Sequence, residues 1–331
     1  MLFSTRPQSL WAFFLQAGLL GAMLFFFSCF LRTETPQNLR LPLIVNVHEH
    51  IESAEAAQKY LDAAERQQIS LTVILGSPKA TLVPGLQGFQ GEDPNNRSLL
   101  KLAHENPDRF IVFPTLNPED PRKLERLEEY VRLGAKGLKL YSGHGIYHRL
   151  PLDEASMLPV YAYCQRKQLP VMLHVNPALY QEEFENVLRA FPDLKVICPH
   201  YCLSTLRTDR FRRLMDRYPN LYTDTSFGYI GFFKEALLRF SKDPQTYRAL
   251  ILRYQDRILF GTDLVVTDES YKTAHWLEQM IRGYRSLLEK ETFSFFDLPG
   301  RTLNGLRLDR KVLKKIYSRN FERLMGGRWA G

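Results

Sequence analysis

The chain has 331 residues, of which 45% are hydrophobic and 24% are charged, and its formal net charge is +8. This composition is ordinary for a globular protein and excludes wholesale disorder and fibrous repeats. The 44 basic and 36 acidic residues are spread along the chain. They argue against nucleic acid as a partner and are compatible with weak attraction to an anionic membrane surface. Four cysteines in a chain of this length do not make a disulfide scaffold.

The first forty residues form a segment of their own. Residues 10–31 contain no charged side chain, and a helix of that length reaches about 33 Å, enough to cross the ~30 Å core of a bilayer. We expect residues 1–31 to be an uncleaved membrane anchor and residues 32–42 to be a polar linker. The alternative is a secretory signal whose Cys29 becomes lipidated.

The orientation of this predicted anchor is not fixed by charge. Arg6 precedes the apolar stretch, and Arg32 and Arg40 follow it, so the positive-inside rule favours neither direction. Because an N-terminal hydrophobic segment commonly directs export, we expect the globular domain on the exported, periplasmic or extracytoplasmic side of the membrane.

From Leu43 onward, short apolar runs rich in β-branched residues alternate with amphipathic helical stretches. Such strands, separated by helices, are typical of a parallel sheet covered on both faces. Eight of these units predict an α/β fold over residues 43–331, a distorted (β/α)8 TIM barrel, with an extra C-terminal helix over 310–325. The predicted strands are residues 43–47, 70–75, 109–114, 136–141, 170–175, 194–199, 220–224 and 257–262, and the predicted helices between them include 53–68, 96–106, 120–133, 153–168, 181–191 and 205–218.

A doubly wound open sheet is the alternative architecture. It predicts a glycine-rich phosphate loop after an early strand, whereas the first strand here runs into Val47-His48-Glu49-His50. Two helix starts can also be predicted: Asp153 as an N-cap, and Pro244 after Asp243.

Four histidines and one aspartate fall at the ends of the predicted strands. His48 and His50 close the first strand, and residues two apart on a strand point to the same face. His174 lies at the end of the fifth strand, His200 at the sixth and Asp263 at the eighth. Because barrel enzymes build their sites at the carboxyl ends of the strands, we expect the five side chains to meet there.

Taken singly, each of these histidines would more commonly be a hydrogen-bonded polar residue, and Asp263 could cap a helix. The chain has only eight histidines, however, and burying unpaired imidazoles costs roughly 1–3 kcal/mol each. A divalent metal ion removes that cost, so the combination predicts a site for one such ion. Imidazole and carboxylate ligands favour zinc, with manganese, iron and nickel as alternatives.

The order of these residues resembles the amidohydrolase superfamily, with His-x-His on the first strand and His, His and Asp on later strands. The details are similar to its amidohydrolase-related branch, which also contains metal-dependent decarboxylases of the aminocarboxymuconate semialdehyde type. The resemblance covers about residues 43–325. It rests on five short motifs: Val45 to His50, Gly137 to Leu140, Leu173-His174, Pro199-His200 and Leu259 to Asp263.

The resemblance implies a role for each residue of the set. His48, His50 and His174 would be metal ligands, and Asp263 would be a ligand or would accept a proton from the metal-bound water. His200 would orient or activate that water or polarise the substrate. The chain departs from the family pattern in two places: Asn46 stands where many relatives have Asp, and Leu264-Val265 follows the last Asp where relatives often have Trp or Pro.

The chemistry also follows from the residues themselves. Three neutral imidazoles leave the charge of the metal largely intact, so a bound water ionises near neutral pH, with a pKa of ~7 in favourable zinc sites. Asp263 and His200 would shuttle the proton. We therefore expect a hydrolase acting on the amide, ester or lactone carbonyl of a small substrate. Two alternative functions stay open: a non-oxidative decarboxylase (a carboxy-lyase) and a non-catalytic membrane-tethered binding barrel. A homodimer is also compatible with the sequence.

Further residues are candidates for binding the substrate. Lys139 ends the fourth strand, and we expect it to be an unmodified lysine that offers a positive charge to an anionic substrate, although a structural ion pair is an equal alternative. Some superfamily members carry a carbamylated lysine at this point. Tyr141 and His144 lie in the loop that follows, and Asn176 lies two residues after His174.

The cysteines near the sixth strand do not predict a structural zinc. Cys198 and Cys202 flank His200, but a four-ligand site needs a second pair, which Cys164 alone does not supply. We expect Cys198 to pack as a small apolar residue. In an exported domain at least one of these three cysteines would stay a free thiol unless Cys29 or another chain took part.

Overall fold

The computed structural model describes residues 44–83 and 85–327. The predicted anchor, linker and Cys29 lie outside the described residues. Within the described part of the chain, no helix is both long and apolar enough to span a bilayer. The membrane attachment and the exported location therefore stay predictions.

Eight parallel strands make up the centre of the fold. They are β1 (Ile44–Glu49), β2 (Ile69–Leu75), β3 (Phe110–Phe113), β4 (Leu138–Gly143), β5 (Val171–Val175), β6 (Val196–Cys198), β7 (Leu221–Asp224) and β8 (Ile258–Leu259). Continuous pairing runs from β1 to β3 and from β4 to β8. A parallel bridge between Thr115 and Lys139 joins the two groups. On the other side, Val47 N donates to Phe260 O at 2.8 Å. The strands thus close into a barrel, which confirms the predicted TIM-barrel-like fold and rules out the open sheet.

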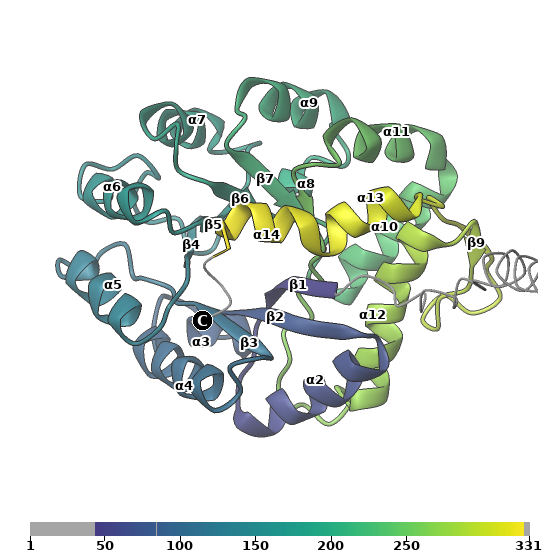
Figure 1. The fold of residues 1–331 in the computed structure, drawn as a ribbon, viewed down its shortest axis with the longest axis horizontal. Coiled ribbons are helices and arrows are strands. Elements are labelled where there is room, and N and C mark those ends of the chain that lie inside the picture. Colours follow the sequence, from purple (N-terminus) through teal and green to yellow (C-terminus); the bar gives the residue numbers. More distant parts are fainter. Residues whose placement is uncertain (1–43, 84, 328–331) are drawn as a thin grey trace, which may run out of the picture. The chain divides into compact units, whose positions relative to one another are not determined.

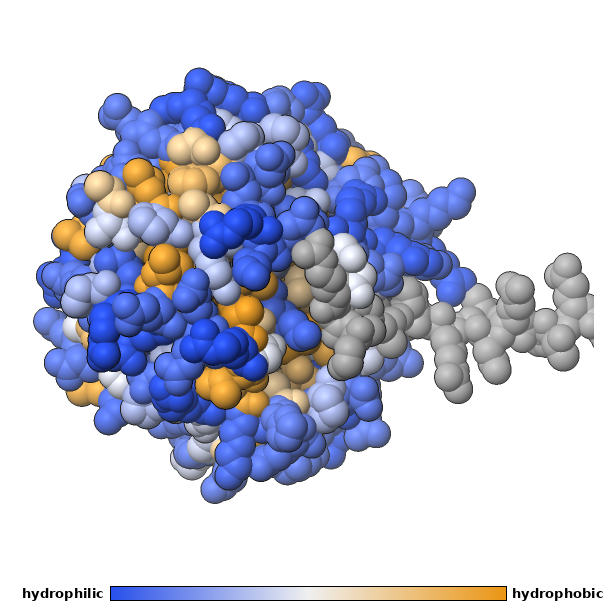
Figure 2. Space-filling view, turned by 60° about the vertical axis from the view of Figure 1, so that its left-hand side comes forward, coloured by the Kyte–Doolittle hydropathy of each residue, from blue (hydrophilic) through white to orange (hydrophobic). Residues whose placement is uncertain are grey.

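Helices surround the strands (Figure 1). They are α2 (Ala54–Arg66), α3 (Lys79–Leu82), α4 (Glu92–Glu105), α5 (Lys123–Arg132), α6 (Leu158–Lys167), α7 (Gln181–Ala190), α8 (Pro199–Leu203), α9 (Thr208–Arg217), α10 (Ile230–Lys242), α11 (Pro244–Tyr254) and α12 (Ala274–Glu289). A small hairpin of β9 (Thr292–Phe293) and β10 (Leu303–Asn304) follows α12. Figure 2 brings forward the flank with α5, α6 and α7, where hydrophilic residues predominate and apolar ones occur in small groups.

Each helix packs one apolar face on the barrel. In α2 the buried residues Ala56, Tyr60, Ala63 and Ala64 recur every three or four positions, so they share one side of the helix. The helix begins where the side chain of Ser53 accepts a hydrogen bond from Ala56 N at 3.0 Å. This layer joins the outer faces of the strands and the helices into one continuous apolar core.

The barrel interior is a second apolar cluster, and the C-terminal helix closes it at one end. Residues 310–325 are helical, as predicted, with a π-helical turn between α13 (Arg310–Lys314) and α14 (Asn320–Met325). Figure 1 shows this segment crossing the end of the barrel. Phe321 and Leu324 pack among interior side chains such as Val45. Lys195, which precedes β6, donates to Leu324 O at 2.7 Å, so α14 covers the amino ends of the strands and leaves the carboxyl ends for the site.

One of the two predicted helix starts is wrong. The helix predicted from Asp153 begins only at Leu158, and Asp153 instead accepts a hydrogen bond from Asn186 at 2.6 Å. This partner lies on α7, far along the chain, so local sequence does not indicate it. The other prediction is confirmed: Asp243 caps α11 by accepting a hydrogen bond from Thr246 N at 3.2 Å.

Candidate metal centre

The carboxyl ends of the strands bring the predicted histidines and Asp263 to one buried cluster. His48 lies on β1 and His50 follows it, while Asp263 follows β8. Gly261 makes this approach feasible, because a Cβ at that position would lie 3.0 Å from the Cβ of His48 and 3.2 Å from that of Asp224. A glycine after β8 therefore lets the two strand ends pack closely enough for their side chains to meet.

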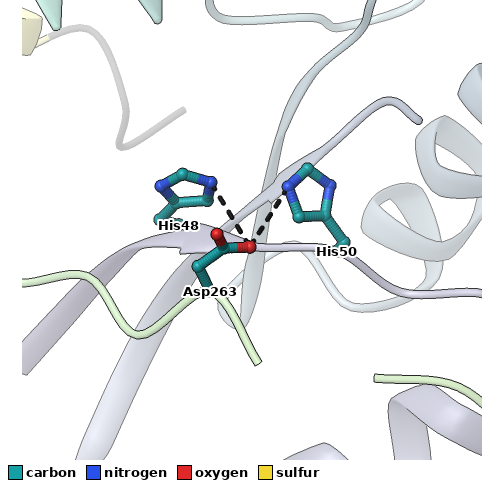
Figure 3. Close-up of side chains that lie close together, drawn as sticks. All are labelled: His48, His50 and Asp263. Atoms are coloured by element: carbon teal, nitrogen blue, oxygen red, sulfur yellow. Dashed lines mark ion pairs between the residues drawn. The ribbon is translucent and has the colours of Figure 1, made fainter. Parts of the chain in front are cut away.

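Three atoms converge on one point (Figure 3). Asp263 Oδ1 lies 3.5 Å from His48 Nε2 and 3.4 Å from His50 Nε2, so the carboxylate sits between the two imidazoles. All three side chains are buried, and their candidate ligand atoms lie within 4.8 Å of one another. Asp263 Oδ1 has no hydrogen-bond partner among the described residues.

The hydrogen bonds at the far side of each ring fix which nitrogen carries the proton. His48 Nδ1 lies 2.7 Å from Oδ2 of the Asp224 carboxylate, which can only accept. His50 Nδ1 lies 2.7 Å from Ser77 Oγ, whose own proton goes to Leu75 O at 2.9 Å. Both rings therefore donate through Nδ1 and present the lone pair of Nε2 to Asp263.

Burial keeps these imidazoles neutral. It lowers the pKa of His48 to about 3 and that of His50 well below its usual value, with a further contribution from the Lys139 charge. Burial also raises the pKa of Asp263, although Lys139 opposes the shift. The Nε2 atoms of His48 and His50 thus face Asp263 Oδ1, and a cation between them would stabilise this arrangement. Two neutral imidazoles and a carboxylate oxygen are a donor set that suits a divalent metal ion.

His200 approaches the other oxygen of Asp263. Its Nε2 lies 3.6 Å from Asp263 Oδ2. Its backbone is left-handed, with φ of 59°, and its N–H donates to Asp224 Oδ1 at 2.9 Å. Ser226 Oγ donates to the same carboxylate oxygen at 2.6 Å and lies 2.9 Å from His200 Nδ1. The hydroxyl thus accepts the Nδ1 proton, and Nε2 of His200 faces Asp263 with its lone pair.

His174 lies at the edge of the cluster, beside His200, and not with His48, His50 and Asp263. Its ring centroid lies 5.0 Å from that of His200 and 4.5 Å from that of His144. Burial lowers its pKa well below the usual value, so the ring is neutral. Its nitrogens lie outside the His48, His50 and Asp263 group. The structure therefore brings two of the three predicted imidazole ligands together with Asp263 and places the third beside His200.

Sequence reasoning missed two residues that hold the histidines of the cluster, Asp224 and Ser226. Asp224 is buried at the end of β7 and holds both His48 and His200. Ser226 bridges this carboxylate to His200. A sequence signal existed for Asp224, because it is the last residue of a predicted strand and strand ends are where barrel enzymes carry functional groups.

Three of the four predicted substrate-binding residues lie at the cluster. Lys139 is buried with Nζ 3.4 Å from His48 Nε2 and 4.9 Å from the centre of the Tyr141 ring. Tyr141 donates to Gly76 O at 3.1 Å. His144 stacks edge-on against His174. Asn176 turns into its own loop, where its Oδ1 accepts a hydrogen bond from Ala178 N at 3.0 Å.

Cys198 does not pack as a free apolar side chain, as the sequence suggested. It forms a disulfide with Cys202, which spans the left-handed segment that contains His200. Among the cysteines of the described residues, Cys164 is the free thiol, and it is buried. Whether Cys29 or another chain pairs with it stays outside the described residues.

A pocket of about 240 Å³ adjoins the cluster. Leu264, which follows Asp263, forms part of its wall, and so does Gly228. A Cβ on Gly228 would lie 3.0 Å from Asp263 Oδ2. The pocket therefore lies next to the carboxylate that faces both the metal centre and His200.

Comparisons with known proteins agree with this geometry. Residues 47–326 match the sequence profile of the family described as amidohydrolase. A comparison with curated proteins finds no match.

Solved structures share the fold at low sequence identity. The putative 2-pyrone-4,6-dicarboxylic acid hydrolase from Pseudomonas putida is 18% identical, with a TM-score of 0.58 over 87% of this chain and 98% of that one. The 2,6-dihydroxybenzoate decarboxylase from Rhizobium is 18% identical, with a TM-score of 0.54 over 87% of this chain and 99% of that one. The 4-oxalomesaconate hydratase from Rhodopseudomonas palustris is 16% identical, with a TM-score of 0.54 over 86% and 96%. These similarities establish the fold, and the profile match together with the buried His, His and Asp cluster establishes the family: the chain belongs to the amidohydrolase family.

Proposed function

We propose that this chain is a metal-dependent hydrolase that cleaves an amide, ester or lactone bond of a small substrate. The observation that carries the proposal is the convergence of three candidate ligand atoms, His48 Nε2, His50 Nε2 and Asp263 Oδ1. His200 approaches the second oxygen of the same carboxylate. Hydrolysis needs one group that takes a proton from water and one that gives a proton to the leaving group.

His48, His50 and Asp263 would hold the metal, with His174 as the candidate for a further imidazole ligand. When bound, a divalent ion of this kind, zinc in the first instance, polarises a carbonyl oxygen and lowers the pKa of water. Asp263 would use one oxygen for the metal, and its other oxygen is left to accept a proton. His200 Nε2, at 3.6 Å from Oδ2, is placed to receive that proton and to deliver it to the departing group.

The remaining residues orient the reacting groups. Ser226 and the Asp224 carboxylate hold the His200 ring through Nδ1 and the backbone N–H. Lys139 is positioned to attract a negative or polar group of the substrate, because its buried ammonium has no carboxylate in hydrogen-bonding contact among the described residues. Its contacts are His48 Nε2 and the sulfur of Met172, at 3.4 and 3.6 Å.

Lys139 also supports a second candidate, a metal-dependent decarboxylase. A buried ammonium beside the metal centre suits a substrate carboxylate, and one of the similar structures is a decarboxylase of a hydroxybenzoate. Decarboxylation needs one proton delivered to carbon. It would therefore use only one of the two proton-transfer groups, Asp263 and His200.

The test uses the full-length chain, purified in detergent and loaded with zinc, against panels of amides, esters, lactones and aromatic carboxylates. Acid release is the expected result, and carbon dioxide release instead would assign the decarboxylase. His200→Asn is expected to lower kcat by about 10²–10⁴-fold, while the matched variant His104→Asn, on the exposed face of α4, is expected to leave it unchanged. No turnover on any panel, or an unchanged rate in His200→Asn, would contradict the proposal.

We also propose that residues 10–31 tether this enzyme to a membrane. The support is the length of the uncharged apolar stretch in the sequence. Alkaline carbonate washing of membranes should leave the full chain in the pellet, and deletion of residues 1–31 should release the catalytic domain. Extraction of the full chain by carbonate would overturn the tether.

A further inference from the structure

The pocket beside Asp263 has a composition unlike that of the metal centre. Its walls come from α3, the loop after β7 with the start of α10, the loop after β8, and α12. The wall is mainly aliphatic and aromatic, with Ile230, Leu264, Trp276 and Met280 among its members. It therefore offers contact area to an apolar group rather than hydrogen bonds to a polar one.

The charged residues of the wall satisfy each other. Lys272 Nζ lies 3.0 Å from Glu269 Oε2 and donates to Val265 O at 2.7 Å. The pair thus leaves no net charge on the wall to select an ionic headgroup. The polar part of a substrate has its partners at the cluster instead, where Lys139 and the metal-binding atoms lie.

Two residues of the pocket wall, Gly228 and Leu264, are neighbours of Asp263. Gly228 adopts a φ of +69°, and a Cβ there would stand 3.0 Å from Asp263 Oδ2. The absence of a side chain at position 228 thus lets this part of the pocket wall lie close to the carboxylate. The apolar pocket and the carboxylate are therefore neighbours in the site.

Two aromatic side chains of the pocket wall are exposed to solvent. Tyr229 and Tyr271 line the pocket and are 71% and 54% exposed. Tyr229 continues toward the exposed Phe232, with ring centres 6.0 Å apart. Grouped exposed aromatic side chains of this kind are unusual for a surface that contacts only water. They extend the apolar surface beyond the pocket.

We propose that the enzyme acts on amphiphilic substrates, acyl amides, esters or lactones, whose alkyl chain occupies this pocket while the carbonyl lies at Asp263. The proposal rests on the hydrolase function above and specifies its substrate class. A volume of about 240 Å³, at ~30 Å³ for each water-sized group, holds a chain of roughly six to eight carbons. Longer chains leave between Tyr229 and Tyr271.

The first test measures binding, independently of turnover. Calorimetric titration of the metal-loaded full chain with butanamide, hexanamide, octanamide and decanamide should show an affinity that rises up to about fourfold per methylene and levels off near eight carbons. Ile230→Trp, which fills the pocket, should flatten this dependence. Leu238→Trp on the same helix lies outside the pocket and should keep it. Trp276→Ala, which enlarges the pocket, should move the plateau to longer chains.

The outcomes separate this inference from the proposed function. Affinity that does not depend on chain length, or a dependence that survives in Ile230→Trp, overturns the pocket assignment. Hydrolysis of short polar substrates without any chain-length dependence would keep the hydrolase and reject the amphiphile. Length-dependent binding without hydrolysis of any of the corresponding amides, esters or lactones would keep the pocket and reject the hydrolase.

Discussion

The substitution Asp224→Asn tests whether the Asp224 carboxylate fixes the proton of His48 on Nδ1. Oδ1 of Asp224 accepts three hydrogen bonds, from His200 N, Ser226 N and Ser226 Oγ, and the amide oxygen of Asn can keep all three. Oδ2 accepts one, from His48 Nδ1 at 2.7 Å, and in Asp224→Asn an NH₂ group takes that position. Two donors would then face each other, so His48 has to move its proton to Nε2, the atom it presents to Asp263.

The expected loss of metal affinity follows from this replacement of one oxygen by an NH₂ group. Asp224→Asn loses one charge-assisted hydrogen bond, worth about 1.5–3 kcal/mol, and the lone pair of one candidate metal ligand. Changes of this kind behind a metal-binding histidine typically cost 10–100-fold in metal affinity, which corresponds to about 1.4–2.8 kcal/mol. The fold should be kept, because the three bonds to Oδ1 persist, and the free energy of unfolding of the metal-free protein should fall by no more than about 1.5–3 kcal/mol.

The assay is competition between the purified protein and a chromophoric zinc chelator at fixed pH, with urea unfolding of the metal-free protein as the stability readout. Asp209→Asn is the matched control, since Asp209 is an exposed carboxylate on α9. Equal zinc affinity in Asp224→Asn and wild type would refute the reasoning about the proton on His48. A large loss of stability without metal would show that Asp224 acts on the fold instead.

Three further outcomes are expected. Gly261→Ala should cost about 1–3 kcal/mol in urea unfolding, since the new methyl would meet two side chains at 3.0 and 3.2 Å, whereas Gly145→Ala, with open space around it, should change stability little; equal effects would contradict the close packing. Cys164 should resist thiol reagents in the native protein and react once it is unfolded, because it is buried and burial raises its pKa; rapid native labelling would argue against this placement. Tyr60→Phe should lower the free energy of unfolding by about 1–2 kcal/mol, since the Tyr60 hydroxyl bonds the buried Asn46 amide at 2.8 Å; an unchanged value would mean that the remaining partners of Asn46 compensate.

The regular part of the fold could be predicted because its signal is local. β-branched apolar runs alternate with amphipathic stretches, and each strand is found close to its predicted place. The first strand was placed at 43–47 but runs to Glu49, since buried polar residues look like the end of a strand in sequence. Their burial is stabilised by long-range partners: Asn46 Nδ2 donates to Thr262 Oγ1 at 2.8 Å.

The site could be predicted only in part, because many of its contacts join residues far apart in the sequence. His48, His50 and Asp263 stand out in the sequence because they lie at the ends of the first and last predicted strands. These two strands are neighbours in a closed barrel. The hydrogen bonds that set their protonation depend on three-dimensional proximity, as with Asp224, whose partner His48 is 176 residues away. The apolar pocket combines segments from four separate parts of the chain, so no sequence window contains it.

The central claim is that His48, His50 and Asp263 form a metal site, and metal analysis tests it most directly. The full-length protein is stripped with a chelator, reloaded with zinc, desalted and analysed by mass spectrometry of its metal content, beside His50→Ala, Asp263→Ala and the control His104→Asn. We predict close to one equivalent of zinc in wild type and His104→Asn, and almost none in His50→Ala or Asp263→Ala. Absence of bound metal in wild type and in the control, or full retention in both site variants, would contradict the account.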